Sequence, residues 1–159
     1  MGQVSPPRPE PILAKPFWER PLTSLNKDEW EALCDGCGKC CLNKLEVEDE
    51  ESGDVRVYPT NVTCRLLDRE TGRCSDYRNR RKYVPDCIRL TAGAVVGLGW
   101  LPMTCAYRLR SVDEPLPAWH YLISGSRETV HSAGQSVRGW TISEVVAGPL
   151  ENHLVERSI

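Results

Sequence analysis

Short amphipathic stretches, rather than long ones, make up the hydrophobic pattern of this chain. In residues 27–33, Trp30 and Leu33 lie three positions apart, and acidic residues occupy the first turn. Asn26 stands before them in the position of a helix cap, with Glu29 three residues later. This combination is typical of a helix N-terminus, so the sequence predicts a short helix over residues 27–33.

Alternation of apolar and charged residues replaces the helical pattern further along the chain. Leu45 and Val47 alternate with charged residues, as do Val55 and Val57. A period of two predicts strands, and the polar segment with a glycine between them predicts a turn. We therefore expect a β-hairpin with one solvated face. A further strand is expected over residues 140–146.

Proline marks one end of the expected domain. Residues 1–24 hold six of the twelve prolines, which restrict the backbone and remove hydrogen-bond donors. We therefore expect an extended or disordered arm over residues 1–24, a domain over residues 25–149 and a C-terminal tail over residues 150–159. A chain of 159 residues is long enough for one domain. The elements predict a small single α+β domain with short helices, one or two hairpins and long irregular loops.

The charge of the chain argues against two broad classes of partner. Twenty Lys and Arg against 22 Asp and Glu leave a net charge of −2, so no overall field attracts nucleic acid or a membrane surface. The apolar runs are far shorter than the ~20 residues of a membrane span. The N-terminus has no apolar segment of the secretory type, so we expect a cytoplasmic protein.

Cysteine is the residue that stands out in the composition, with eight copies beside one Phe and two Met. Reduced cytosolic cysteines more often hold metal or perform redox chemistry than form disulfides. Disulfides among closely spaced cysteines would also require strained loops. Half of the cysteines lie within eight residues, at Cys34, Cys37, Cys40 and Cys41.

The spacing of these four cysteines predicts a metal site. A C-x-x-C turn places two sulfurs on one side of a tight loop, and Gly36 and Gly38 allow backbone N–H groups to turn towards them, which stabilises thiolates. A third cysteine at the same spacing gives three converging thiolates, as in ferredoxin-like segments. Cys41 breaks this spacing, so we expect its side chain to diverge from that of Cys40 and to serve a second site or complete the first differently.

The other four cysteines are dispersed along the chain, at Cys64, Cys74, Cys87 and Cys105. Eight thiolates divide into two sites of four, which would suit two zinc ions, or one iron–sulfur cluster beside a structural site. Lys39 and Arg80 are expected to offset thiolate charge. Two alternatives stay open: a metal that only staples the loops together, and Cys105 as a small apolar side chain in the core.

The cysteine run, together with Cys74-Ser-Asp-Tyr77-Arg-Asn-Arg80 and Cys87, resembles the CxxCxxCC cysteine-cluster family of zinc- or iron-chelating proteins, in its YcgN-like bacterial branch. The resemblance extends over about residues 29–139. It implies a cytoplasmic metal-binding protein and no particular reaction. A bacterial flagellin lysine N-methylase is similar in its cysteine motif and is thought to hold an iron–sulfur cluster, which favours iron, as a 4Fe–4S cluster, over zinc. Shorter members of the family often have a proline directly after the arginine that corresponds to Arg80. This chain has Arg81 at that position.

Three functional hypotheses follow. The first is electron transfer, redox sensing or iron delivery by a cluster, with a protein redox partner. The second is a zinc-stapled adaptor that binds a protein or RNA through the basic run at residues 78–82, which is otherwise a solvated face. The third, a methyltransferase-linked enzyme, lacks a glycine-rich cofactor loop, and no catalytic residue is assigned. His120, between two aromatic residues, is interpreted as a packed histidine rather than a ligand.

Overall fold

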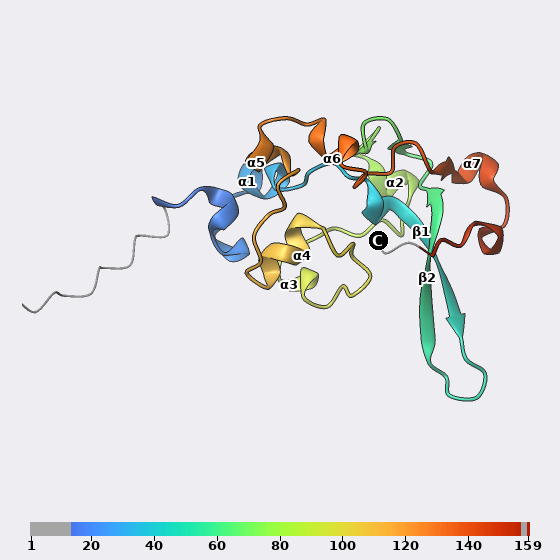
Figure 1. Ribbon diagram of the computed structural model, residues 1–159. Coiled ribbons are helices and arrows are strands. Elements are labelled where there is room, and N and C mark those ends of the chain that lie inside the picture. Colours follow the sequence, from blue (N-terminus) through green and yellow to red (C-terminus); the bar gives the residue numbers. More distant parts are fainter. Residues whose placement is uncertain (1–13, 157–158) are drawn as a thin grey trace, which may run out of the picture.

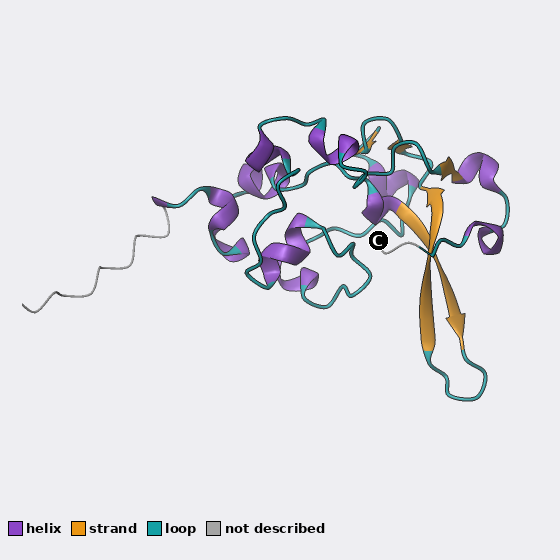
Figure 2. Ribbon diagram, in the orientation of Figure 1, coloured by secondary structure: helices purple, strands orange, loops and turns teal. Residues whose placement is uncertain are grey.

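In the part of the chain that the structure describes, seven short helices and two small sheets form a single α+β domain, with many residues in loops (Figures 1 and 2). The computed structural model describes residues 14–156 and residue 159. The helices are α1 (Lys27–Ala32), α2 (Arg80–Tyr83), α3 (Ala92–Val95), α4 (Ala106–Ser111), α5 (Tyr121–Ser124), α6 (Thr129–Ser132) and α7 (Glu144–Ala147). The strands are β1 (Leu42–Glu48), β2 (Val55–Thr63), β3 (Leu67–Asp68), β4 (Arg73–Cys74) and β5 (Ile142–Ser143). The 3-10 helices are η2 (Phe17–Glu19), η3 (Leu22–Ser24), η4 (Lys39–Cys41) and η5 (Leu150–His153).

The helix expected over residues 27–33 is confirmed as α1. Its capping box is complete, because the Glu29 backbone N–H donates to Asn26 Oδ1 at 2.9 Å and the Asn26 backbone N–H donates to Glu29 Oε1 at 3.0 Å. Two of the backbone donors that a helix N-terminus leaves unpaired are therefore satisfied locally. The helix begins where the cap places it and delivers the chain to Cys34.

The expected hairpin is confirmed as β1 and β2, but it does not have one solvated face. The two strands pair antiparallel and project away from the body of the domain (Figure 1). Glu46 pairs with Val57 and Val47 pairs with Arg56, so each face carries apolar and charged residues together. Val47 and Val55 are exposed. The expectation was wrong because the end of the ribbon has no core to cover either face.

The strand expected over residues 140–146 is correct only for β5. This strand pairs parallel with β2, with Val62 beside Ile142 and Thr63 beside Ser143. The remainder of the prediction is wrong, because the chain turns at once into α7. The Ser143 side chain caps that helix by accepting a hydrogen bond from the Val145 backbone. A serine in the N-cap position stops the strand despite the apolar residues that follow.

Two apolar clusters hold the domain together. The large core consists of six buried residues from η3 to α4, namely Leu22, Leu33, Val95, Leu101, Ala106 and Tyr107. The small core consists of Leu42, Leu67 and Val137. The cysteine loop, residues 34–41, starts directly after Leu33 of the large core and ends directly before Leu42 of the small core. Both ends of the loop are therefore anchored by burial.

The boundaries of the expected arm and tail stay predictions. Phe17 and Trp18 pack against the large core, and Leu22 belongs to it. Leu154 forms an isolated bridge with Thr60 of β2. Residues 1–13 of the expected arm and residues 157–158 of the expected tail lie outside the described residues.

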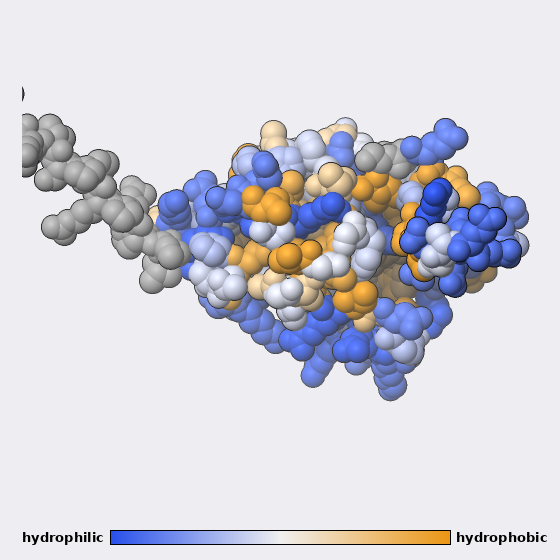
Figure 3. Space-filling view, turned by 90° about the horizontal axis from the view of Figure 1, so that it is seen from below, coloured by the Kyte–Doolittle hydropathy of each residue, from blue (hydrophilic) through white to orange (hydrophobic). Residues whose placement is uncertain are grey.

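Apolar surface is visible on the face seen from below, where hydrophobic residues gather around the region of α3 and α4 (Figure 3). None of the helices in the described parts of the chain is long and apolar enough to cross a membrane.

Candidate metal centre

The backbone of the cysteine loop turns its N–H groups towards sulfur, as its glycines predict. Gly36 and Gly38 have φ values of 78° and 74°, in the left-handed region that favours glycine. The Gly36 backbone N–H hydrogen-bonds to the Cys34 sulfur, and the Lys39 backbone N–H hydrogen-bonds to the Cys37 sulfur. Both donors lower the pKa of the thiol that they contact. The C-x-x-C turn is thus built to favour thiolates.

Two other segments hold the cysteine loop in place. Gly72, at a φ of 71°, packs its backbone so closely that a Cβ there would overlap the carbonyl oxygen of Gly36. On the other side, the Val137 backbone N–H donates to the Cys37 carbonyl oxygen at 2.9 Å. The loop is therefore held between the β3–β4 hairpin and the segment before β5.

Four cysteines, Cys34, Cys37, Cys40 and Cys105, form what we call the first cysteine group. Cys34 is within electrostatic range of Cys40 and Cys105, Cys37 is within range of Cys34 and Cys40, and Cys105 is within range of Cys40. Cys105 reaches the loop because its neighbour Thr104 accepts a hydrogen bond from the buried Lys39, at 2.8 Å. This contact joins residues 65 positions apart, so spacing alone could not reveal it.

Three cysteines, Cys64, Cys74 and Cys87, form the second cysteine group. The Cys64 thiol lies in the field of Cys74, Cys87 and the carboxylate of Glu144, and it accepts the backbone N–H of Leu66. Cys74 sits in β4, paired with Leu67 of β3. The turn at Gly72 brings this part of the chain back on itself, as its sequence position predicts.

Cys41 lies between the two groups. Its thiol shares a hydrogen bond with the thiol of Cys40 instead of diverging from it. Its carbonyl oxygen accepts the Cys64 backbone N–H at 2.9 Å, and its side chain packs against the small core. Cys41 therefore touches the first group through its side chain and the second through its backbone.

The metal-free thiols of the first group are held protonated. Burial raises the pKa of Cys34 to about 12, with further increases from Cys40 and Asp35, and burial raises the pKa of Cys105 to about 11. The pKa of Cys37 is also raised, by burial first and by Asp35 next. Cys34 is nevertheless exposed to solvent. A bound metal cation reverses this balance, because it stabilises the thiolate directly.

Lys44 is a cation near the first group that the sequence did not single out, and the roles expected of Lys39 and Arg80 stay predictions. The Cys41 thiol and burial raise the pKa of Cys40, and Lys44 opposes this rise. Its ammonium also lies 4.6 Å from the ring centroid of Trp100. Lys39 is bonded to Thr104, and Arg80 lies over the ring of Tyr77 at 3.9 Å. Lys44 lies on β1, outside the cysteine motif, so the motif alone does not indicate it.

His120 is fully buried and has a structural position, in agreement with its interpretation as a packed histidine. Its Nδ1 accepts the Leu122 backbone N–H at 3.1 Å, which leaves Nε2–H to donate to the Leu33 carbonyl oxygen at 2.8 Å. Both ring nitrogens are therefore used, and the second bond fixes the residue before Cys34. Burial lowers the pKa of His120, which keeps the ring neutral.

Asp35 is a buried carboxylate inside the cysteine motif, with no role assigned to it from the sequence. Its Oδ1 accepts the Cys37 backbone N–H at 3.0 Å, which is an Asx-turn across the first half of the loop. Aspartate's tendency to bond to the backbone two residues later is the signal that could have identified this role. Its negative charge also raises the pKa of the Cys34 and Cys37 thiols, so a bound cation would be needed to stabilise their thiolates.

The donor set suits a thiophilic metal, although the thiols are not arranged around one point. Thiolates select zinc, iron–sulfur clusters or copper(I) over hard cations. Within residues 14–156 and 159, no three or more His, Cys, Asp or Glu side chains are arranged to hold a metal ion. No disulfide forms among the eight cysteines. The free thiols and their backbone donors fit metal binding chemically.

Comparison with known proteins supports this assignment. Residues 33–106, which include all eight cysteines, match the family model described as "CxxCxxCC: Putative zinc- or iron-chelating domain". A UPF0260 protein of Rhizorhabdus wittichii is 59% identical over 146 residues, which are 91% of this chain and 97% of the relative. This chain belongs to the UPF0260 family. Another UPF0260 protein, from Rhodobacter capsulatus, is 60% identical over 80% of this chain and 84% of the relative.

A third UPF0260 relative has a lower sequence identity. A UPF0260 protein of Ectopseudomonas mendocina is 51% identical over 91% of this chain and 97% of the relative. No solved structure matches the chain. The matched domain supports metal binding and is compatible with zinc or with iron. The resemblance noted from the cysteine motif is therefore confirmed at the level of the family.

Proposed function

We propose that this UPF0260 protein binds an iron–sulfur cluster of the 4Fe–4S type through the first cysteine group and acts in the cytoplasm in electron transfer, redox sensing or iron handling. The observation that carries this proposal is that Cys105 lies close enough to Cys34 and Cys40 to interact with them electrostatically, which makes it the candidate for a fourth thiol beside the C-x-x-C-x-x-C run. Four thiolates are the usual ligand number of such a cluster. A bound cluster of this kind supplies one-electron chemistry.

The protein's own residues prepare this site in three ways. The backbone N–H groups of Gly36 and Lys39 stabilise two of the sulfurs as thiolates. Lys44 offsets part of the negative charge that four thiolates would bring. The large and small cores fix the two ends of the loop, which limits how far the thiols can separate.

The second cysteine group is proposed as a separate structural metal site. Cys74 and Cys87 both act electrostatically on Cys64, and none of the first group is a named cause of the Cys64 pKa shift. Cys41 is proposed as a ligand that either site can recruit, because its thiol is bonded to that of Cys40 and its backbone to Cys64. All eight cysteines are thereby proposed as ligands, divided differently from their order along the chain.

Anaerobic purification followed by metal analysis and an absorption spectrum tests the proposal. A brown protein with absorbance near ~400 nm and about four irons per chain is expected. Cys37→Ser should lose the iron and the absorbance. A colourless protein without iron would overturn the cluster, and full iron content in Cys37→Ser would overturn the site.

A zinc-stapled adaptor is the second candidate function. The observation that favours it is the division of the thiols into two groups, because two closed four-ligand sites suit two structural zinc ions. The basic run at residues 78–82 would then offer a protein or RNA contact, and Arg78, Arg81 and Lys82 are exposed. About two zincs per chain in a colourless protein is the outcome that selects this function.

A further inference from the structure

A charged pocket of about 190 Å³ lies beside the cysteine loop. Its lining comes from three parts of the chain: the loop itself, the β3–β4 hairpin and the segment around α6. The lining residues are Asp35, Thr71, Arg73, Arg127, Glu128, His131 and Arg138. Three arginines around one small pocket are unusual, since their like charges repel unless something offsets them.

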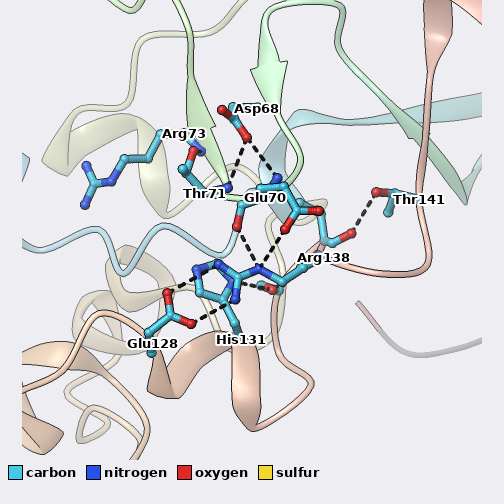
Figure 4. A network of polar contacts seen from close by, with 10 residues as sticks. Asp68, Glu70, Thr71, Arg73, Glu128, His131, Arg138 and Thr141 are labelled. Carbon is cyan, nitrogen blue, oxygen red and sulfur yellow. Dashed lines mark hydrogen bonds and ion pairs between the residues drawn. The ribbon is translucent and has the colours of Figure 1, made fainter.

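One of the three arginines is neutralised within the fold. The guanidinium of Arg138 donates to Glu128 Oε2 at 2.8 Å and to the Glu70 carbonyl oxygen at 2.8 Å (Figure 4). The Glu70 carboxylate lies 3.7 Å from Arg138 Nε. Arg138 therefore joins the hairpin to α6, and Glu128 is committed to this pair.

Arg73 differs from Arg138 in having no such partner. Its guanidinium forms no hydrogen bond or ion pair with any residue that the structure describes, and no interaction is drawn to it in Figure 4. Its Nε and Nη2 lie 3.9 Å from where a Cβ on Gly36 would be. The side chain thus rests against the cysteine loop with all of its donors free.

Arg127 approaches the same loop from α6's side of the pocket. Its guanidinium stacks on the ring of Tyr121, 3.4 Å from the centroid, and its Nη1 lies 3.5 Å from the Cys34 carbonyl oxygen. Stacking holds the planar group in one orientation without neutralising its charge. No carboxylate within the described residues forms an ion pair with Arg127.

The pocket carries more positive than negative charge once the ion pair between Arg138 and Glu128 is set aside. Glu128 is paired with Arg138, and the Asp35 carboxylate is partly satisfied by the Cys37 backbone. His131 bonds through Nδ1 to Ser136 at 2.7 Å and adds a ring that burial keeps neutral. The guanidinium groups of Arg73 and Arg127, neither of which has a carboxylate partner within the described residues, each present a planar fork of donors that matches the oxygens of a phosphoryl group.

We infer that this pocket binds a phosphate-type oxyanion, either free phosphate or the phosphoryl group of a small phosphorylated compound, between Arg73 and Arg127. The Thr71 hydroxyl, on the rim of the same pocket, supplies a further hydrogen-bonding group. Asp35 faces the pocket as well, so a ligand that carries a donor group beside its phosphoryl oxygens fits better than a bare polyanion. This inference does not depend on which metal the cysteines bind.

Isothermal titration of the purified protein with inorganic phosphate, in a chloride buffer, tests the inference. One saturable site per chain is expected. Arg73→Met and Arg127→Met should each weaken binding about tenfold or more, because each removes a charged hydrogen-bonding fork. Arg73→Lys, which keeps the charge but not the fork, should fall between wild type and Arg73→Met.

Arg56→Met is the matched control, because Arg56 is an exposed arginine on β2, outside the pocket and outside the basic run. It should bind phosphate as wild type does. Absence of saturable binding, or equal weakening by Arg56→Met and Arg73→Met, would overturn the inference. Thermal unfolding of each variant shows that it is folded. The metal content of each variant is measured as well. A variant that loses phosphate binding but keeps its metal shows that phosphate does not bind to the metal, and this result is independent of the test of the metal site.

Two further titrations distinguish the sources of the anion. Glycerol phosphate represents a phosphorylated compound, and acetate represents a carboxylate. Tighter binding of glycerol phosphate than of free phosphate assigns the pocket to a phosphoryl ester, and the reverse order assigns it to the free ion. Acetate that binds as tightly as either would contradict a phosphate-type site.

Discussion

The two cysteine groups differ in how the fold presents them. The first group stands on a loop whose ends are fixed by two apolar clusters and whose turn is held between a hairpin and a distant backbone segment, and its fourth member, Cys105, directly precedes α4. The second group stands on β4 and on loops, with Glu144 beside it. Exposure does not separate the groups, because Cys34 and Cys40 are exposed while Cys64, Cys74 and Cys87 are partly buried. The groups differ in the contacts that fix the chain around the thiols.

This difference indicates that the two groups depend on metal in different ways. The first group has supports that do not involve metal, so its loop keeps its position while its thiols are protonated. The second group is held by a two-residue strand pair and single backbone hydrogen bonds, so we expect metal to contribute more of the order there. We therefore expect a functional cofactor at the first group, where the fold holds the loop in place. At the second group we expect a metal whose role is to hold the chain segments together.

Replacing one ligand in each group gives the largest expected effect. Cys37→Ser should remove all metal from the first group, and Cys87→Ser should leave that metal in place and remove only the second. Loss of a structural metal costs about 10 kcal/mol of binding free energy, so Cys87→Ser should also lower the melting temperature. Metal analysis and thermal unfolding of both variants are the measurements. Loss of all metal in both would mean that the eight thiols form one site.

A methyl group at Gly72 should break the support of the first group. In Gly72→Ala, the new Cβ overlaps the Gly36 carbonyl oxygen, which is backbone and cannot move aside, so we expect ~4 kcal/mol of destabilisation and weaker metal binding. Gly53→Ala is the matched control, because Gly53 has a similar φ of 72° with nothing within 4 Å of the Cβ position.

The control should cost only about 1–2 kcal/mol, for the left-handed backbone. Urea unfolding of both variants measures the difference. Equal losses in the two variants would show that the packing of Gly72 on the cysteine loop contributes nothing.

Removing the charge of Lys44 should have the smallest effect. Lys44→Met keeps the length of the side chain but takes away the cation near Cys40 and Cys41, so metal in the first group should bind about tenfold more weakly. Lys27→Met, on the exposed side of α1, should leave the affinity as it is. Competition with a chelator measures both affinities, and an unchanged affinity in Lys44→Met would remove Lys44 from the site.

Local signals accounted for much of the secondary structure. The capping box at Asn26 and the alternating pattern of β1 and β2 were sufficient, because each depends on residues close together in the chain. The strand expected over residues 140–146 failed where a serine cap competed with an apolar run. The single solvated face of the hairpin failed because it assumed a core that the ribbon does not reach.

The sequence by itself determined the chemistry of the site: eight thiols, a C-x-x-C-x-x-C spacing, and glycines that turn backbone donors towards sulfur. Only the tertiary structure decided which thiols meet. Cys105 joined the loop and Cys41 came to lie between the groups, because Lys39 bonds to Thr104 and Cys64 bonds to Cys41 across long stretches of chain. Contacts of this kind depend on how the two cores pack, and no spacing in the chain encodes them. The pocket between Arg73 and Arg127 has the same origin.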